Sequence, residues 1–271
     1  MKSLSSLLIT SALIAASTTA SAALVAGDIA LVGFQASGSP TDSFSFAALV
    51  NVDAGTVLYF TDNGFTTGSG FRGVTSLDND GNEGMVKYTV GASGLAAGQV
   101  VSSLSTNAAN GTWTSTGLVY GTTSGSGSYA PLSFAANAGE QITVFTSTNA
   151  QPMLSGYTAL YNFDNSGVYE AATSSNTGQL SPGLVQGTSA VLLNNMTTSF
   201  QNFNFAAFSG PADRDTWLAR IGNAANWTFA GTTASPVTTN VADGSFSVGA
   251  VPSPGAVALL GLAGLVARRR R

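Results

Sequence analysis

The chain has 271 residues, of which 32 are Gly, only 8% are charged, and none is Cys or His. The missing residue types exclude a Ser-His-Asp triad, a Cys nucleophile, a thiolate or imidazole zinc site, and disulfides. All thirteen acidic residues and only four of the nine basic residues lie between the chain ends, so the central region has a net charge of −9. Such a region repels phosphate backbones, which argues against nucleic acid as a partner.

The first 22 residues have the layout of a secretory signal peptide. Lys2 provides a charged start, an apolar stretch covers Leu7 to Ala16, and small residues from Ala20 to Ala22 form an exit of the A-x-A kind. A buried N-terminal helix is the weaker interpretation, because the apolar run is short and gives way to Ser and Thr. We therefore expect export, with signal peptidase cleaving after Ala22.

Residues 250–271 read as a short membrane anchor that ends in a basic cluster. The last residues of the chain are Val251, Pro252, Ser253, Pro254 and Gly255, then an apolar run from Ala256 to Ala267, then Arg268, Arg269, Arg270 and Arg271. The twelve apolar residues would form a helix of about 18 Å, shorter than a hydrocarbon core of about 30 Å. The arginines favour the cytoplasmic side, so we expect a temporary anchor in the inner membrane with the body outside.

This order of Pro motif, short apolar helix and terminal arginines resembles the PEP-CTERM sorting signal of exported proteins from Gram-negative bacteria. Ser253 stands where the most familiar form of the motif has Glu. The resemblance implies that an exosortase-type enzyme cleaves near the Pro motif. It further implies delivery from the inner membrane to the cell surface or an extracellular matrix. It covers the tail alone and implies nothing about the activity of the body.

Residues 23–249 are expected to form one all-β domain. Their apolar stretches are short and bounded by Gly, Asn, Ser and Pro, which is typical of strands. Strands are predicted at Asp28–Phe34, Ser43–Val50, Thr56–Thr61, Met85–Val90, Gln99–Leu104, Gln141–Thr146, Tyr157–Phe163, Ala190–Leu193, Trp227–Ala230 and Ser245–Val248. An Asn-Gly turn is expected at Asp62-Asn63-Gly64. Strands this frequent favour a two-sheet β-sandwich or a jelly roll over a parallel α/β fold.

One short helix is expected near the C-terminal end of the body. Asp213 and Asp215 suit the positive end of a helix dipole, and Gly222 can end the helix. The apolar face of this helix would consist of Trp217, Leu218 and Ile221.

The body also resembles a domain of exported bacterial proteins that has no assigned role. The residues that carry the resemblance are Gly27–Ala30, Val57–Phe65, Glu83–Gly84, Asp215–Trp217 and Asn226–Thr228. The resemblance implies a single domain from the first strand to the last and attaches no activity to it.

The densest polar cluster of the chain runs from Asp78 to Gly84. Calcium takes six to eight oxygen ligands, and Asp78, Asp80 and Glu83 are the candidate ligands here. The spacing is not that of an EF-hand, and a solvated hairpin loop is the alternative interpretation. No other cofactor is expected.

Trp113 is the candidate ligand-binding aromatic residue, because it lies among Gly, Thr and Ser rather than in an apolar run. Core packing explains Trp217 and Trp227 better. A glycosidase needs two carboxyl groups about 5 to 9.5 Å apart across a cleft. Asp53 and Asp62 flank one strand at opposite ends, where we expect loop-end acids that keep the surface hydrated. No catalytic residue is predicted.

The sequence thus predicts a non-enzymatic, exported protein of the cell surface or extracellular matrix. The alternative is a carbohydrate-binding or calcium-assisted adhesion module with a polysaccharide partner. That module requires an exposed aromatic pair or an oxygen-lined loop. A lower alternative is a glycoside hydrolase with paired carboxylates, which requires two acids meeting in a cleft.

Overall fold

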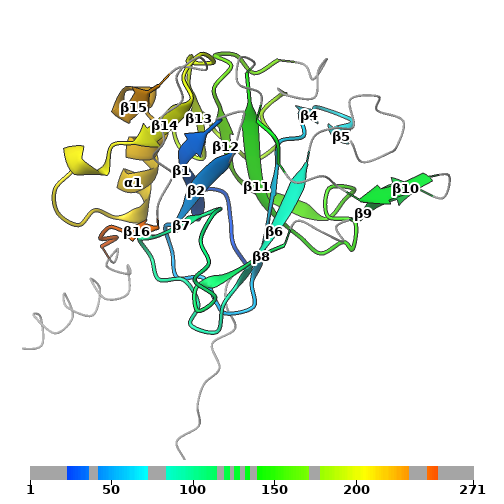
Figure 1. The fold of residues 1–271 in the computed structure, drawn as a ribbon, viewed down its shortest axis with the longest axis horizontal. Helices are drawn as coiled ribbons and strands as arrows, with labels where there is room; N and C mark the ends of the chain where they lie inside the picture. Colours follow the sequence, from blue (N-terminus) through cyan, green and yellow to red (C-terminus); the bar gives the residue numbers. More distant parts are fainter. Residues whose placement is uncertain are drawn as a thin grey trace, which may run out of the picture.

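The computed structural model describes residues 23–36, 42–72, 84–114, 119–122, 125–128, 132–134, 139–170, 178–231 and 243–249. These residues form a body rich in strands with one α-helix, which confirms the all-β prediction (Figure 1). The expected signal peptide and the expected C-terminal helix lie outside the described residues.

The first sheet has six strands in the order β15-β14-β1-β2-β7-β16, and every pairing in it is antiparallel. Its strands are β1 (Ile29–Gln35), β2 (Ser43–Ala48), β7 (Gln99–Ser102), β14 (Phe200–Phe203), β15 (Trp227–Ala230) and β16 (Gly244–Ser245). All residues of β1 and β2 are buried, which places these two strands at the centre of the body.

The second sheet also has six strands, in the order β13-β12-β11-β3-β6-β8. Its strands are β3 (Val57–Thr61), β6 (Met85–Val90), β8 (Gly111–Thr114), β11 (Gln141–Ser147), β12 (Tyr157–Asp164) and β13 (Ala190–Leu192). The β12–β13 pairing is parallel, whereas the other pairings of this sheet are antiparallel. Two hairpins pair with neither sheet: β4 (Phe65–Thr66) with β5 (Gly70–Phe71), and β9 (Val119–Thr122) with β10 (Gly125–Ser128).

Side chains from both sheets meet in one hydrophobic core. The ring centroids of Phe34 on β1 and Phe163 on β12 lie 5.0 Å apart, and those of Phe46 on β2 and Phe60 on β3 lie 5.2 Å apart. The amide of Gly27, just before β1, donates a hydrogen bond of 2.7 Å to the carbonyl of Leu160 on β12. The two sheets are therefore joined by packed aromatic rings and by backbone.

A second, smaller cluster covers the opposite face of the second sheet. Tyr59 alternates with the core residues Leu58 and Phe60 along β3, so its side chain points to the other face. There it stacks on Phe145 of β11, and Phe71 of β5 packs on the same ring at 5.3 Å. The small β4–β5 hairpin is thus held by apolar contact with the back of this sheet.

Helix α1 (Arg214–Ile221) forms where the sequence predicted a helix, flanked by the 3₁₀ turns η1 (Phe205–Ala207) and η2 (Ala224–Asn226). The side chain of Asp213 accepts a hydrogen bond of 2.7 Å from the amide of Thr216, which caps the N-terminus. Gly222 is the C-cap. The predicted apolar face is confirmed, since all three of its residues are buried: Trp217, Leu218 and Ile221.

Every predicted strand is found except Ser245–Val248, of which only Ser245 lies in a strand, β16 (Gly244–Ser245). Strands β8 and β14 were not predicted, nor were the two small hairpins.

The expected Asn-Gly turn is wrong. Gly64 is not among the described glycines with positive φ, and Asp62 and Asn63 are buried. The chain instead runs on toward β4, and the buried side chains of these two residues bond to backbone groups of Gly84 and Ser133.

Candidate functional site

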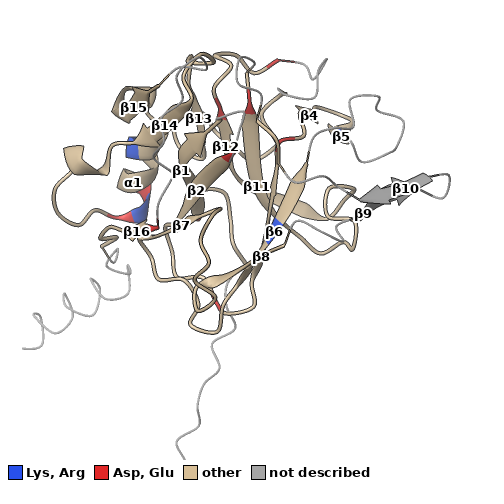
Figure 2. Cartoon of the chain, viewed as in Figure 1, with Lys and Arg blue, Asp and Glu red and all other residues tan. Residues whose placement is uncertain are grey.

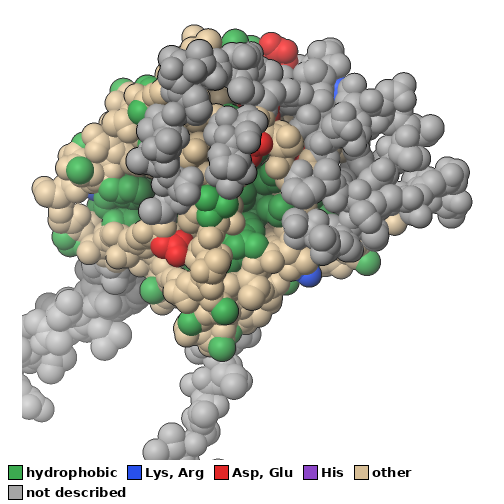
Figure 3. Space-filling model, in the orientation of Figure 1, with side chains coloured by type: hydrophobic (Ala, Val, Ile, Leu, Met, Phe, Trp, Pro, Cys, Tyr) green, Lys and Arg blue, Asp and Glu red, His purple; other side chains and the backbone are tan. Residues whose placement is uncertain are grey.

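The best candidate site in the described part of the chain is a pocket of about 190 Å³ at the seam between the two sheets. Residues of β2 in the first sheet and of β6 and β8 in the second sheet line it, together with residues that follow β7 and the segment 132–134. Among the described residues, the lining includes Asp42, Phe44, Val86, Ser103, Leu104, Trp113, Thr114, Leu132 and Phe134. Figure 3 shows hydrophobic side chains in several patches on the face of the body that it presents.

Trp113, the aromatic residue that the sequence singled out, forms part of this lining. It is half-buried on β8, an outer strand of the second sheet. Its ring packs against four others, with centroids 4.7 to 6.0 Å away: Phe44, Phe46, Phe60 and Tyr88. Its indole N–H donates a hydrogen bond of 3.0 Å to the carbonyl of Ser102. The ring is therefore a fixed wall of the pocket rather than a free surface platform.

Three polar residues line the pocket beside the aromatic wall: Asp42, Ser103 and Thr114. The Asp42 carboxylate accepts a hydrogen bond of 2.8 Å from the amide of Phe134. The Ser103 hydroxyl accepts one of 3.0 Å from the amide of Phe44. Polar residues thus lie next to an apolar surface, a combination that small-molecule sites also have.

Sequence reasoning found Trp113 but missed the other lining residues. They come from segments far apart in the chain, and no short motif joins them. The signal that could have found Phe44 is the alternation of Ser and Phe at the start of β2, which places Phe44 and Phe46 on one face.

Burial of Tyr88, which packs against Trp113, raises the pKa of its phenol to about 12, and the nearby Asp243 carboxylate adds to this effect. Tyr88 is therefore neutral at physiological pH and serves as packing beneath the pocket.

Asp62 is not the hydrated loop-end acid that the sequence predicted. Its side chain is 0% exposed, whereas Asp53 on the other side of β3 is exposed. The two Asp62 oxygens accept hydrogen bonds from the amide of Gly84 at 2.5 Å and from the amide of Ser133 at 3.1 Å. The Asp62 carboxylate therefore joins the end of β3 to the segments around Gly84 and Ser133, which is a structural role.

The second sheet holds a buried polar layer that sequence reasoning also missed. Across β11 and β12, Gln141 pairs with Asp164 and Thr143 with Asn162, and none of the four is more than 1% exposed. The Asn162 side-chain amide donates a hydrogen bond of 2.9 Å to the Thr143 hydroxyl. These residues alternate with core residues such as Ile142, so sequence alternation alone would place them in solvent.

Asp164 supplies the carboxyl group of this layer. Burial raises its pKa to about 6, hydrogen bonds from Ser166 act in the opposite direction, and the charge of Glu170 raises it slightly. One carboxylate oxygen accepts bonds from the amide and the hydroxyl of Ser166, at 2.7 and 2.6 Å. The other, Oδ2, has no hydrogen-bond partner among the described residues.

Figure 2 shows the acidic residues of the described ranges spread over several elements, with a group of them beside α1. Within the described ranges no three acids come close enough to hold a metal ion. The expected calcium ligands, Asp78, Asp80 and Glu83, lie outside the described residues.

Trp217 and Trp227 are core residues, as predicted, with 2% and 4% exposure. Their indole N–H groups donate to the carbonyls of Ser247 and Ile221, respectively. Neither ring is available for a ligand.

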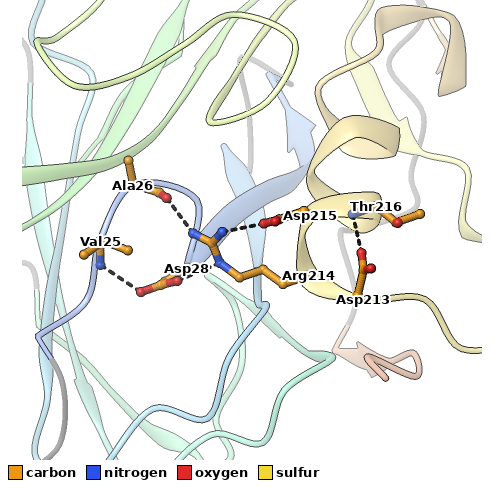
Figure 4. Close-up of polar contacts among 7 residues, drawn as sticks. All are labelled: Val25, Ala26, Asp28, Asp213, Arg214, Asp215 and Thr216. Carbon is orange, nitrogen blue, oxygen red and sulfur yellow. Dashed lines mark hydrogen bonds and ion pairs between the residues drawn. The ribbon is translucent and has the colours of Figure 1, made fainter. Parts of the chain in front are cut away.

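Arg214 of α1 bonds to residues just before β1, and we call this group of residues the clasp (Figure 4). Arg214 donates from Nε to the Asp28 carboxylate at 2.8 Å and from Nη2 to the carbonyl of Ala26 at 2.6 Å. The other Asp28 oxygen accepts a bond of 2.8 Å from the amide of Val25. A further ion pair joins Arg214 to Asp215, whose side chain is 84% exposed. This cluster is a structural clasp and holds no reactive group.

Comparison of the chain with family models, curated proteins and solved structures finds no match. In the part of the chain that the structure describes, no helix has the length and apolar character needed to cross a membrane.

Proposed function

We propose that this chain is an exported, non-enzymatic protein of the cell surface or extracellular matrix, made by a Gram-negative bacterium. The observation that carries the proposal is the order of Pro motif, apolar run and four arginines in residues 251–271. In this proposal signal peptidase removes residues 1–22. The C-terminal tail then holds the protein in the inner membrane until an exosortase-type enzyme cleaves it near Val251–Gly255. The two sheets that share one core support a β-sandwich or jelly-roll-like fold for the body.

The placement of the basic residues in the body supports a role outside the cell. Trypsin-like proteases need an accessible, locally unfolded segment around Lys or Arg. Lys87 lies inside β6 and is paired on both sides, with β3 and with β8. Arg214 and Arg220 lie in α1, where the Arg220 guanidinium carbon is 4.7 Å from the ring centroid of Trp217. A body with so few basic residues, three of them in regular structure, suits survival among extracellular proteases.

The sorting proposal is tested by deleting residues 251–271 and separating the host's inner membrane, cell surface and medium. The full chain is expected in the surface fraction, and the deleted chain in the periplasm or medium. A second variant replaces Arg268–Arg271 with Gln, which removes the cytoplasmic stop and keeps the Pro motif. If the deleted chain reached the surface in the same amount as the full chain, the proposal would be wrong.

A carbohydrate-binding adhesion module is the second candidate function. The pocket beside Trp113 is the observation for it, although its aromatic rings are half-buried or buried and do not form the exposed pair that the sequence analysis required. In its calcium-assisted form the ligands would be Asp78, Asp80 and Glu83. A rise in melting temperature on adding calcium to the full chain, absent when all three residues are changed to Asn or Gln, is the expected result for that form. No change with calcium in either protein would remove it.

A further inference from the structure

We infer that one face of the body rests on the zwitterionic lipid of the membrane surface while the tail anchors the protein. This face consists of Phe205–Ala212 and Phe246, and we call it the exit face because the chain leaves the body beside it. The inference rests on the anchoring tail of the proposed function. It goes beyond that function by naming the surface of the body that meets the lipid and the kind of lipid that it meets.

The point at which the chain leaves the body is fixed by residues 243–249. Strand β16 pairs with β7, and the amide of Phe246 donates a hydrogen bond of 2.9 Å to the carbonyl of Gly98. The amide of Gly249 donates one of 2.7 Å to the carbonyl of Ala212. Because bonds hold this segment up to its last residue, the free length of chain between body and membrane starts after Gly249.

The free length is short compared with the body. Six residues, 250–255, lie between Gly249 and the apolar run, and they span at most about 22 Å. The apolar run is about 12 Å shorter than the hydrocarbon core, so part of that span is drawn toward the bilayer unless the bilayer thins. A body of residues 23–249 has an expected radius of gyration of about 17 Å and thus a diameter of about 45 Å. The tail is therefore too short to let the far side of the body reach the membrane.

The exit face is apolar and lies directly beside the point of exit. No residue of Phe205–Ala212 is charged. The ring centroids of Phe205 and Phe246 lie 4.9 Å apart, and Phe246 packs on the buried Trp217 at 4.5 Å. Apolar and aromatic side chains are stabilised at the boundary between headgroups and acyl chains. The exposed residues of the face are Ala206, Ala207, Ser209, Gly210 and Pro211, and the half-buried rings are Phe205, Phe208 and Phe246.

The charges near the exit face select the kind of lipid. Asp213 and Asp215 are exposed at the start of α1, immediately after Ala212. Together with the net charge of −9 in the central region, they repel anionic headgroups. Zwitterionic headgroups carry no net charge and leave the apolar contact unopposed. The contact itself can be weak, because the tail keeps the face at a high effective concentration next to the lipid.

The absence of Cys from the chain allows a direct test, since one introduced Cys carries a single fluorescent label. Ser209→Cys labels the exit face, and Ser69→Cys labels the β4–β5 hairpin, which Figure 1 shows on the side of the body away from β16. Each labelled full chain is inserted into phosphatidylcholine vesicles whose headgroups carry a nitroxide quencher. We expect strong quenching of the label at position 209 and little at position 69. In phosphatidylglycerol vesicles the quenching at position 209 should be lower.

Ala207→Asp separates lipid contact from mere tethering. Ala207 is exposed, so the new charge leaves the core untouched, and most of the quenching at position 209 should be lost. Thr67→Asp is the matched control, because Thr67 is exposed in the β4–β5 hairpin. Its quenching should equal that of the unchanged chain.

Equal quenching at positions 69 and 209 would overturn the inference, as would unchanged quenching in Ala207→Asp or stronger quenching in phosphatidylglycerol. In each of these cases the chain still floats with the vesicles on a density gradient, so the anchoring tail stands. A full chain that does not float with the vesicles would overturn the anchor and this inference together. The flotation step thus distinguishes failure of the inference from failure of the proposed function.

Discussion

Asp164 is expected to make the stability of this protein depend on pH. It is the last residue of β12, its side chain is 0% exposed, and its Oδ2 atom has no hydrogen-bond partner among the described residues. Burial disfavours the charged form and raises the pKa of the carboxyl group from the ordinary value of 3.8 to about 6. At neutral pH the fold therefore contains a buried carboxylate that would be more stable as the neutral acid.

The difference between the two pKa values corresponds to about 3 kcal/mol at 25 °C. The folded state binds the proton more tightly than the unfolded state does. The contribution of this group to stability is therefore highest below the unfolded pKa of 3.8. It is lost as the pH rises through that value toward the folded pKa of about 6. Above the folded pKa the full penalty of about 3 kcal/mol applies.

Urea unfolding of the full chain at a series of pH values between about 4 and about 8 measures this contribution. Asp164→Asn keeps an acceptor for Ser166 and removes the charge, so its stability relative to wild type should rise by about 3 kcal/mol over that range. Asp53→Asn, at an exposed acid, is the control and should follow the wild-type curve. If Asp164→Asn and wild type changed in parallel, the assignment of a buried, destabilised carboxylate would be refuted.

Two further substitutions test the clasp and the last strand. Arg214→Gln should lower the free energy of unfolding by about 2 to 3 kcal/mol, because it leaves the largely buried Asp28 carboxylate without its cation, and an unchanged urea midpoint would contradict this. Gly98→Ala should detach β16 and lower the melting temperature, since a Cβ at this positive-φ residue would lie 1.9 Å from the carbonyl oxygen of Phe246. Gly55→Ala is its control, because φ there is also positive but no atom lies within 4 Å, and an equal loss in both would show backbone strain alone.

Alternation of apolar and polar residues was enough to locate most strands. Met85–Val90 and Trp227–Ala230 were predicted at the bounds that the structure shows. The strands that escaped prediction are all short, and some of them, such as β8 (Gly111–Thr114), are also polar or contain glycine. Pairing with a longer neighbour makes such a segment a strand, and that pairing has no local signature.

The environment of a polar residue likewise has no local signature in the sequence. Asp62 followed by Asn63 and Gly64 has the composition of a turn, yet the structure uses the Asp62 carboxylate to hold the amides of Gly84 and Ser133. Whether an Asp faces water or bonds to a distant backbone amide depends on which segments the fold brings to it. Local composition describes only the residue's own neighbours in the chain.

The sequence by itself determined the all-β class, the helix with its buried face, and the absence of every chemistry that needs His or Cys. These properties follow from composition and from periodicities of two and 3.6 residues, which are local. It also singled out Trp113. Only the tertiary structure decided that Phe44, Asp42 and Phe134 meet this residue around one pocket. The reason is physical: a pocket forms where two sheets fail to fill the space between them, and that depends on how distant segments pack.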